Sequence, residues 1–235
     1  MKNLAKCLFL IFFISTHVNA QYSEGQFAIS TNFNFNTTAK IFLNPDGNIF
    51  ASQTEFFEIE DIFSYSLELR YGLYESLILG LSFEYMQGEG NGRNLANRRF
   101  VVKDGYELYP IELSAYYFLP FSTEDFKFYM GGGIGFYTGY RTRQFGDINF
   151  EDVSSQSTFG IQVSSGMDYM IFDFLSVRGE LRFRDPELII TNKYSSDRVN
   201  YEGLSYTVTQ ENIRSRLNVD GITFRIGLVY HFLPY

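Results

Sequence analysis

The sequence has no tryptophan, one cysteine and only two histidines. Cys7 and His17 both lie in an N-terminal segment that we predict to be removed on export. The mature chain would then have no disulfide, no thiol nucleophile and no thiolate metal site. His231 would be its only histidine, and therefore its only histidine candidate for acid–base catalysis.

Basic charge is also scarce. The chain has 19 Lys and Arg against 27 Asp and Glu, and loss of Lys2 and Lys6 with the N-terminal segment leaves 17 against 27. A net charge of −10 disfavours a nucleic-acid partner. After that segment, no uncharged apolar run approaches the roughly 18 residues of a membrane helix. If the mature protein enters a membrane, it must therefore cross with strands.

Residues 1–20 have the pattern of a secretory signal peptide. Lys2 and Lys6 form a basic start, residues 8–14 form a short apolar run, and Val18-Asn19-Ala20 has the small residues of a cleavage site. The alternative is a membrane anchor helix, but the run is shorter than the roughly 20 residues that a span needs. We expect residues 1–20 to be cleaved and residues 21–235 to form one domain.

Aromatic residues, in contrast, are abundant, with 26 Phe and 18 Tyr. Together with aliphatic residues they recur at every second position in eight segments, which indicates strands with one apolar face. The segments are 27–35, 63–71, 77–85, 109–119, 126–137, 159–169, 175–183 and 222–232.

The connections between these segments alternate in length. Links 72–76, 120–125 and 172–174 are short, whereas 36–61, 87–105, 141–156 and 185–219 are long. All long loops then fall at one end, as in outer-membrane barrels with short periplasmic turns and long extracellular loops. The sequence therefore predicts an all-β fold, an eight-stranded antiparallel up-and-down transmembrane β-barrel. Ten strands are the alternative, if 36–61 supplies a membrane hairpin.

A secreted, lipocalin-like barrel would instead turn its apolar faces inward. The apolar faces hold far more large side chains than the interior of an eight-stranded barrel can accept. The opposite faces are rich in glycine, which suits a crowded lumen. We therefore predict that the large apolar side chains face lipid and that the small and charged ones face the lumen.

Charged side chains in the lumen need partners, because an isolated buried charge is costly. Strict alternation places five acidic and five basic residues there, which favours a self-neutralising plug over the alternative of a selectivity constriction. They are Glu68, Glu84, Glu112, Asp168 and Glu180, and Arg70, Lys127, Arg178, Arg182 and Arg225.

Segment 126–137, Phe-Lys-Phe-Tyr-Met-Gly-Gly-Gly-Ile-Gly-Phe-Tyr, resembles the glycine-rich inner strand of small outer-membrane barrels. The last three segments are similar to those of the OmpA transmembrane domain and OmpX. The resemblance covers the mature chain and implies insertion by the barrel assembly machinery. It also implies a C-terminal assembly signal, comprising Phe224, Ile226, Leu228, Tyr230, Phe232 and Tyr235.

The long loops suggest surface roles. Asn44-Pro45-Asp46-Gly47 is a turn signal, so we expect the first two strands to continue past the membrane as one hairpin. In the loop 185–219, residues 188–191 and 204–209 could pair above the bilayer. Such edges either bind partners by strand addition or only shield the rim. A basic group could hold lipopolysaccharide phosphates or be a solvated face; it comprises Arg93, Arg98, Arg99 and Lys103.

We expect a monomeric, non-enzymatic outer-membrane protein that contacts membrane lipid and lipopolysaccharide and acts through its extracellular loops. No cofactor, metal site or catalytic residue is predicted, and the sequence names no surface ligand. One alternative is a narrow channel for small or apolar solutes. A lipid A-modifying enzyme is a further alternative, although His231 lies at the periplasmic end and the sequence indicates no Ser or Asp partner for it.

Overall fold

The computed structural model describes residues 24–43, 56–93 and 100–232. The predicted signal peptide, Tyr235, the turn 44–47 and Arg98 and Arg99 lie outside these ranges. Among the described residues, no helix is long and apolar enough to span a membrane. The strands found there are β1 (Phe27–Phe42), β2 (Phe56–Tyr74), β3 (Leu77–Arg93), β4 (Val101–Phe118), β5 (Phe126–Phe145), β6 (Ile148–Gln156), β7 (Thr158–Phe172), β8 (Leu175–Arg184), β9 (Glu187–Tyr194), β10 (Arg198–Tyr201), β11 (Leu204–Thr207), β12 (Ile213–Asn218) and β13 (Ile222–His231).

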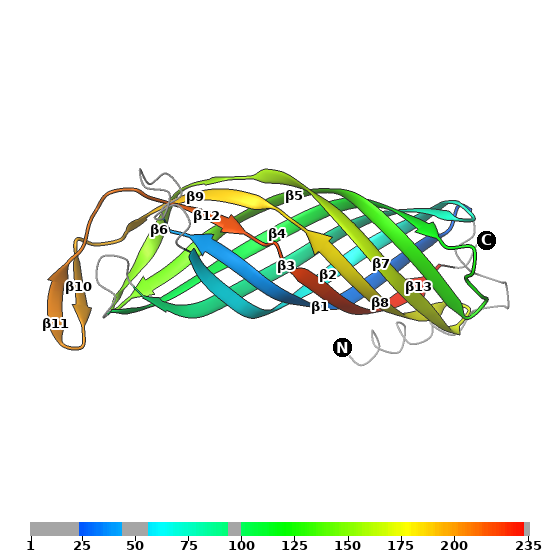
Figure 1. The fold of residues 1–235 in the computed structure, drawn as a ribbon, viewed down its shortest axis with the longest axis horizontal. Coiled ribbons are helices and arrows are strands. Elements are labelled where there is room, and N and C mark those ends of the chain that lie inside the picture. The colour runs from blue at the N-terminus through cyan, green and yellow to red at the C-terminus, as the bar shows by residue number, and fades with distance from the viewer. Residues whose placement is uncertain (1–23, 44–55, 94–99, 233–235) are drawn as a thin grey trace, which may run out of the picture.

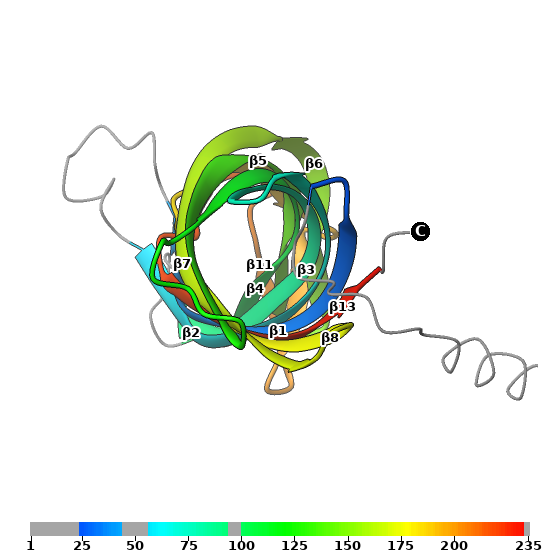
Figure 2. The same cartoon turned by 90° about the vertical axis from the view of Figure 1, so that its right-hand side faces the viewer.

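Eight of these strands form a closed antiparallel ring, in the order β1-β2-β3-β4-β5-β7-β8-β13 (Figure 2). The ring closes between the first and last strands, where Ala28 lies opposite His231 and Asn36 lies opposite Thr223. Closure leaves no free sheet edge, so every backbone group in this ring has a neighbouring strand to pair with. The predicted eight-stranded up-and-down barrel is confirmed.

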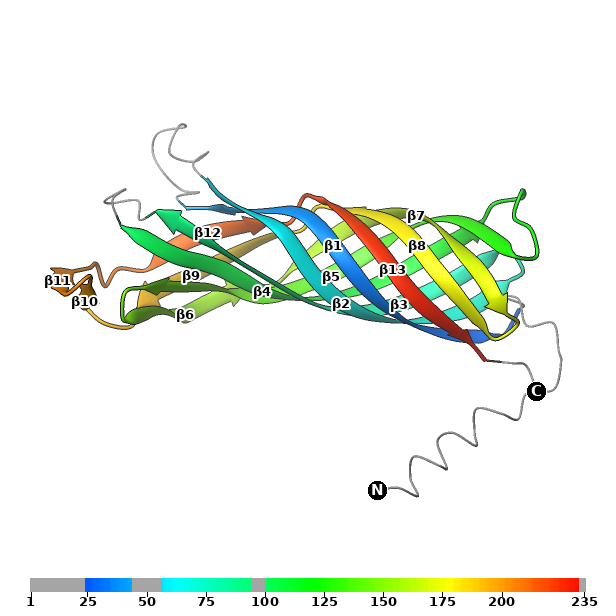
Figure 3. The same cartoon turned by 90° about the horizontal axis from the view of Figure 1, so that it is seen from below.

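A second ring continues the first toward the end that bears the long connections. Here β6, β9 and β12 take the places of β7, β8 and β13, and β12 closes onto β1. Figures 1 and 3 show the resulting long tube, with the β10–β11 hairpin standing out beyond its end. Within the described residues, 36–42 and 56–61 lengthen β1 and β2 and add no strand to the ring. The ten-strand alternative is therefore wrong.

Most of the four predicted long loops are thus strand. The expected pairing of 188–191 with 204–209 is also wrong, because β9 pairs with β12 and β6, whereas β11 pairs with β10. Glu202 and Gly203 between β10 and β11 have φ values of 51° and 81°. Two central residues with positive φ make the tight turn that best matches strand twist, so the local hairpin forms in place of the long-range pair.

A band of apolar side chains surrounds the first ring. On β1 to β4 the outward run covers nine residues each, from Phe27 to Phe35 on β1 and from Leu77 to Tyr85 on β3, for example. Nine to eleven residues are what a tilted strand needs to cross a bilayer. Within the band Phe159 and Ile161 are 75% and 71% exposed. Soluble proteins rarely expose continuous apolar surfaces of this kind to water. The apolar faces point outward, as predicted.

The first two strands exchange their faces at the top of this band. Asn36 lies opposite Ile62 and Thr38 opposite Glu60, and between these pairs Asp61 has a φ of 54°. Below this point even-numbered side chains are buried in both strands, whereas above it Ala39, Ile41 and Ile59 are buried. Asp tolerates the left-handed region better than most residues. The apolar side chains of β1 and β2 therefore turn inward beyond the band.

Candidate functional site

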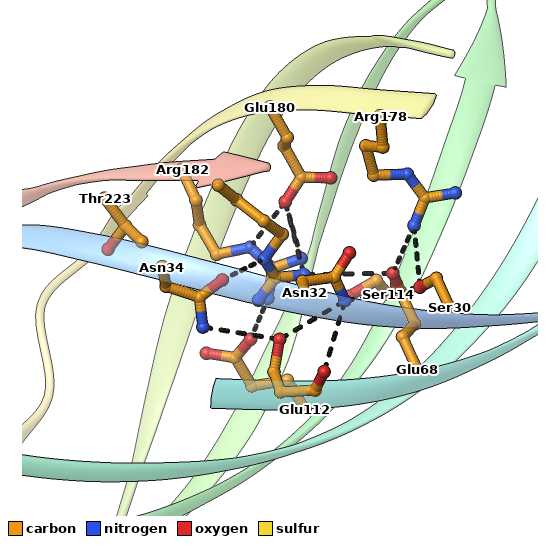
Figure 4. A network of polar contacts seen from close by, with 12 residues as sticks. Ser30, Asn32, Asn34, Glu68, Glu112, Ser114, Arg178, Glu180, Arg182 and Thr223 are labelled. Carbon is orange, nitrogen blue, oxygen red and sulfur yellow. Dashed lines mark hydrogen bonds and ion pairs between the residues drawn. The ribbon is translucent and has the colours of Figure 1, made fainter. Parts of the chain in front are cut away.

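The lumen of the first ring is filled by paired charges (Figure 4). Glu68 of β2 lies 2.8 Å from Arg178 Nη1 and 3.3 Å from Arg70 Nε. Arg178 also binds Asp168 at 2.8 Å, and Arg182 contacts both Glu180 and Glu112. Because these side chains come from β2, β4, β7 and β8, the ion pairs cross the lumen as well as following its wall. We call this set, with Glu84, Arg184 and Arg225, the lumen network.

Tyrosines supply the remaining hydrogen bonds of the lumen network. The hydroxyl groups of Tyr116, Tyr129 and Tyr137 donate to Glu68, Glu180 and Glu112, at 2.5, 2.8 and 2.8 Å. The Arg70 guanidinium also lies 3.9 Å from the centre of the Tyr116 ring, in the geometry of a cation–π contact. The carboxylates therefore accept hydrogen bonds from neutral as well as charged donors, as buried charges require.

Glycine makes room for these tyrosines. A Cβ atom on Gly131 would lie 2.8 Å from the Ala115 carbonyl oxygen and would also meet the Tyr116 ring. One on Gly166 would meet the Tyr129 hydroxyl group at 2.5 Å. The lumen-facing glycines of β5 and β7 are thus the counterparts of large side chains on neighbouring strands.

Nine of the ten predicted lumen charges are brought together and are at most 4% exposed. Lys127 is the exception: among the described residues it makes no ion pair with the lumen network, and it lies near Glu124 and Asp125 at the short-turn end. Arg184 takes its place, binding Glu84 at 2.7 Å and Glu112 at 3.3 Å. The alternation of Arg178 and Arg182, continued by one step, would have identified it.

Beyond the lumen network the interior becomes apolar. A buried cluster fills the second ring, with Ile41 and Ile59 from the exchanged faces of β1 and β2, Met86 of β3 and Leu108 of β4; it also includes Ala39, Leu43, Ile62, Tyr106, Tyr137, Leu188, Ile190, Leu217 and Val219. We call it the apolar core. The interior of the tube therefore has two parts along its axis. It is polar at the height of the apolar band and contains the apolar core beyond that band.

A second charged cluster lies in the second ring, above the outward tyrosines of β3, β4 and β5. Asp104 of β4 accepts hydrogen bonds from Arg141 Nε at 2.8 Å and from Arg143 Nε at 3.0 Å. Burial would raise the pKa of the Asp104 carboxyl, but the two guanidinium groups outweigh it and hold this pKa below its ordinary value. Sequence reasoning missed this cluster because 87–105 and 141–156 were assigned to loops.

His231 has a partner that the sequence did not indicate. Its Nε2 atom lies 2.9 Å from the Ser176 hydroxyl group at the short-turn end of the lumen. Both residues are at most 2% exposed. A nucleophile–base pair needs space for a substrate beside the hydroxyl group, and this pair is enclosed by packed neighbours. Among the described residues, no group of His, Cys, Asp and Glu could hold a metal ion.

Comparisons with known proteins bear on the fold. No protein-family model matches the sequence, and no curated protein does. Among solved structures, the outer membrane protein OprG from Pseudomonas aeruginosa matches with a TM-score of 0.66 at 16% identity, over 90% of this chain and 98% of that one. The chain has the fold of the small outer-membrane β-barrels. Neisserial surface protein A matches at a TM-score of 0.48 and 16% identity, over 89% of this chain and 100% of that one. AlkL matches at 0.48 and 14%, over 94% and 96%.

In this outer-membrane barrel fold the C-terminal strand presents the residues expected of an assembly signal. Phe224, Ile226, Leu228 and Phe232 are 47%, 67%, 52% and 46% exposed on the outer face of the barrel. Tyr230 lies on the same face and packs edge-on against Phe232. Tyr235 lies outside the described residues. Recognition by the assembly machinery stays a prediction, which the outward placement of this row supports.

Proposed function

We propose that this barrel is a non-enzymatic, monomeric protein of the bacterial outer membrane that acts at the cell surface through its second ring. The short turns face the periplasm, and the second ring and the β10–β11 hairpin face the exterior. Outer-membrane lipid and lipopolysaccharide contact the apolar band and its upper rim, and the barrel assembly machinery inserts the chain. OprG, which matches with a TM-score of 0.66, is an outer membrane protein, which supports this location.

The observation that carries the proposal is the closed lumen. The lumen network joins five carboxylates to five guanidinium groups inside one ring of eight strands, and its members are almost fully buried. An ion that passed through would have to break ion pairs in a medium where an unpaired charge costs several kcal/mol. A surface role needs no such opening, since the barrel then serves to hold the second ring at the membrane.

The β10–β11 hairpin is the element best placed for surface contacts. Phe100 packs against Tyr201 and Tyr206 of β10 and β11 and against Phe145 of β5, with ring centres 4.8 to 5.4 Å apart. These aromatic contacts fix the base of the hairpin to the second ring. The outer edge of β10 is partly occupied, because the Asn200 N–H donates to Asp147 Oδ1 at 2.8 Å. Among the described strands β11 pairs only with β10, which leaves its outer edge without a ladder partner. Such an edge accepts an added strand from a partner.

A channel for small or apolar solutes is the second candidate, and the apolar core favours it. An apolar solute that passed the Asp104–Arg141–Arg143 cluster of the second ring would meet the apolar core above the lumen network. Single-channel recording on the purified protein in planar bilayers separates the two functions. We expect no conductance above the lipid baseline. Discrete openings in the wild-type protein would overturn the closed-lumen proposal and favour the channel.

The enzyme alternative has its own test at His231. Since the Ser176–His231 pair is enclosed, we propose that it fixes the short-turn end of the lumen and takes no part in a reaction. Lipid A extracted from cells that express wild-type protein or His231→Ala should therefore have the same mass spectrum. A lipid A species that is lost in the variant, with the variant still folded, would favour the enzyme.

Protease added to intact cells tests the orientation. We expect it to cut the protein at the Glu202–Gly203 turn.

A further inference from the structure

The seam between β5 and β6 leaves a gap in the wall of the second ring. β5 pairs with β7 as far as Tyr137 opposite Thr158, and with β6 only where Gln144 lies opposite Asn149 and Phe145 opposite Ile148. Between these points β5 runs for seven residues, from Tyr137 to Gln144, whereas the facing chain runs for nine, from Thr158 to Asn149. The two segments therefore form no ladder pairs in this interval. The Ser155 hydroxyl group, which donates to the Gly139 carbonyl, bridges the interval.

A cavity of about 410 Å³ lies at this seam. It is lined by side chains of β3 to β6, among them Gln87, Tyr140, Gln144, Asn149 and the two arginines that hold Asp104. Tyr140 also ends the row of outward tyrosines that continues through Tyr109 to Tyr85, with ring centres 6.4 and 5.5 Å apart. Aromatic rows mark the edge of the apolar band in outer-membrane barrels. The cavity therefore opens at the height of the lipid headgroups.

Asp104 can neutralise only one of the two guanidinium groups of this cavity. The guanidinium groups of Arg141 and Arg143 share the single carboxylate of Asp104. The centre of the Phe150 ring lies 5.3 Å from Arg141 Cζ and 5.1 Å from Arg143 Cζ, so this ring covers both groups. Arg141 is 2% exposed, and among the described residues its Nη1 atom has no hydrogen-bond partner. Burial and the neighbouring Arg143 lower the pKa of Arg141, although Asp104 raises it. A buried charged donor without a partner is costly, so the site is incomplete without a further acceptor.

The acidic residues of the cavity do not supply that acceptor. Glu89 lies 3.6 Å from Lys103, and both side chains are more than half exposed. Asp152 accepts a hydrogen bond from Asn192 and forms no ion pair with the arginines within the described part of the chain. The amide groups of Gln87, Gln144 and Asn149, from β3, β5 and β6, also line the cavity and offer further donors.

We propose that this cavity binds an oxyanion, specifically a phosphate group, with Arg141 Nη1 and Arg143 as the charged donors and the amide side chains of the walls as the neutral ones. Guanidinium groups suit phosphate because their planar donors match its oxygens, and charge-assisted hydrogen bonds are about twice as strong as neutral ones. The phosphate belongs either to an outer-leaflet lipid headgroup, given the height of the cavity, or to a free solute. The site does not depend on whether the lumen conducts.

Calorimetric titration of the refolded mature chain in detergent with inorganic phosphate tests the proposal at low ionic strength. We expect saturable binding of one phosphate per chain, weakened about tenfold or more by Arg141→Gln. Asp152→Asn should tighten binding several-fold, because it removes a carboxylate that would repel the phosphate and keeps a side chain that can bond to Asn192. Arg216→Gln is the matched control, since Arg216 is a rim arginine paired with Glu187 at 2.8 Å outside the cavity.

Heat-modifiable gel migration verifies that each variant is folded, and Asp152→Asn decides the matter if Arg141→Gln does not fold. Absence of saturable phosphate binding by the wild-type protein, or equal affinities in wild type and the cavity variants, would overturn the proposal. Repeating the titration in nanodiscs with and without lipopolysaccharide separates the two sources. Competition by lipopolysaccharide assigns the site to a lipid-borne phosphate, and an unchanged affinity assigns it to a free solute.

Discussion

Replacement of Glu68 by glutamine should be among the most damaging single changes in the lumen. Its carboxylate lies within 4 Å of guanidinium nitrogens of Arg178, Arg70 and Arg225, at 2.8, 3.3 and 3.8 Å, and accepts a hydrogen bond from Tyr116. Glutamine keeps the size of the side chain and removes the charge. Loss of one partner from a buried ion pair leaves an uncompensated charge and costs about 3–5 kcal/mol. We expect a decrease of that order in the free energy of unfolding.

Asp220→Asn provides the reference for this measurement. Asp220 binds Lys40 at 2.9 Å, a distance similar to that between Glu68 and Arg178, but the two side chains are 30% and 27% exposed. A partly exposed pair of this kind contributes about 0.2–1 kcal/mol. The two substitutions are chemically equivalent, so the difference in their effects reports the burial of the charge.

Reversible urea unfolding in lipid vesicles measures both free energies, with circular dichroism and the gel shift between folded and unfolded forms as readouts. Tyrosine provides the intrinsic fluorescence, because the chain has no tryptophan. If Glu68→Gln decreases stability no more than Asp220→Asn does, water must reach the carboxylate. The closed lumen would then be refuted.

A charge-balanced double variant sharpens the same test. Arg225 lies 3.8 Å from Glu68 and 3.5 Å from Glu180, so Glu68→Gln leaves it with a reduced share of negative charge. Adding Arg225→Gln restores neutrality in the lumen network. The double variant should therefore lose less stability than the sum of the two single losses. Additive losses would mean that the charges act independently, contrary to a coupled network.

Two further substitutions test the backbone features of the barrel. Gly131→Ala should decrease stability by about 1–3 kcal/mol, because the added methyl group meets the Ala115 carbonyl oxygen and the Tyr116 ring; Gly179→Ala, whose methyl group would meet nothing within 4 Å, should be neutral in the same unfolding assay. Asp61→Val should cost about 1–2 kcal/mol, because a β-branched residue is strained at a φ of 54°, whereas Asp61→Gly should not; equal effects in either pair would contradict the stated cause.

The first ring could be predicted from the sequence because the alternation of apolar residues and the composition of its strands agree. Every second residue from Ile222, the first of β13, to Phe232, just after its end, is large and apolar, and Arg225 lies between them. In a closed ring of antiparallel strands, this pattern alone decides which side faces lipid, since a shift by one residue would reverse all side chains. The same reasoning placed Glu68 and Arg178 in one lumen although 110 residues separate them. Which carboxylate meets which guanidinium depends on strand stagger, which alternation does not encode.

The alternation of apolar residues does not predict the second ring, because the apolar residues change between odd and even positions where that ring begins. Leu181 and Phe183 of β8 are apolar at odd positions, whereas Leu188 and Ile190 of β9 are apolar at even positions. Across the intervening Asp185-Pro186 the inward face becomes the apolar one. A search for one continuous period-two pattern ends at such a point. The change of phase is itself the signal: it marks the height at which the surroundings of the barrel change from lipid to water.

The polar lumen network and the apolar core therefore follow from one physical requirement. Inside the apolar band, lipid covers the outer face, so polar side chains can only point inward and must neutralise one another there. Above the band, water covers the outer face, so the apolar side chains turn inward and pack as in a soluble protein. On β1 and β2 a backbone irregularity at Asp61 makes the exchange, and on the other strands a shift in the sequence does so. The seam at β5 and β6 lies just above this boundary, and the buried Arg141 and Arg143 line the cavity there.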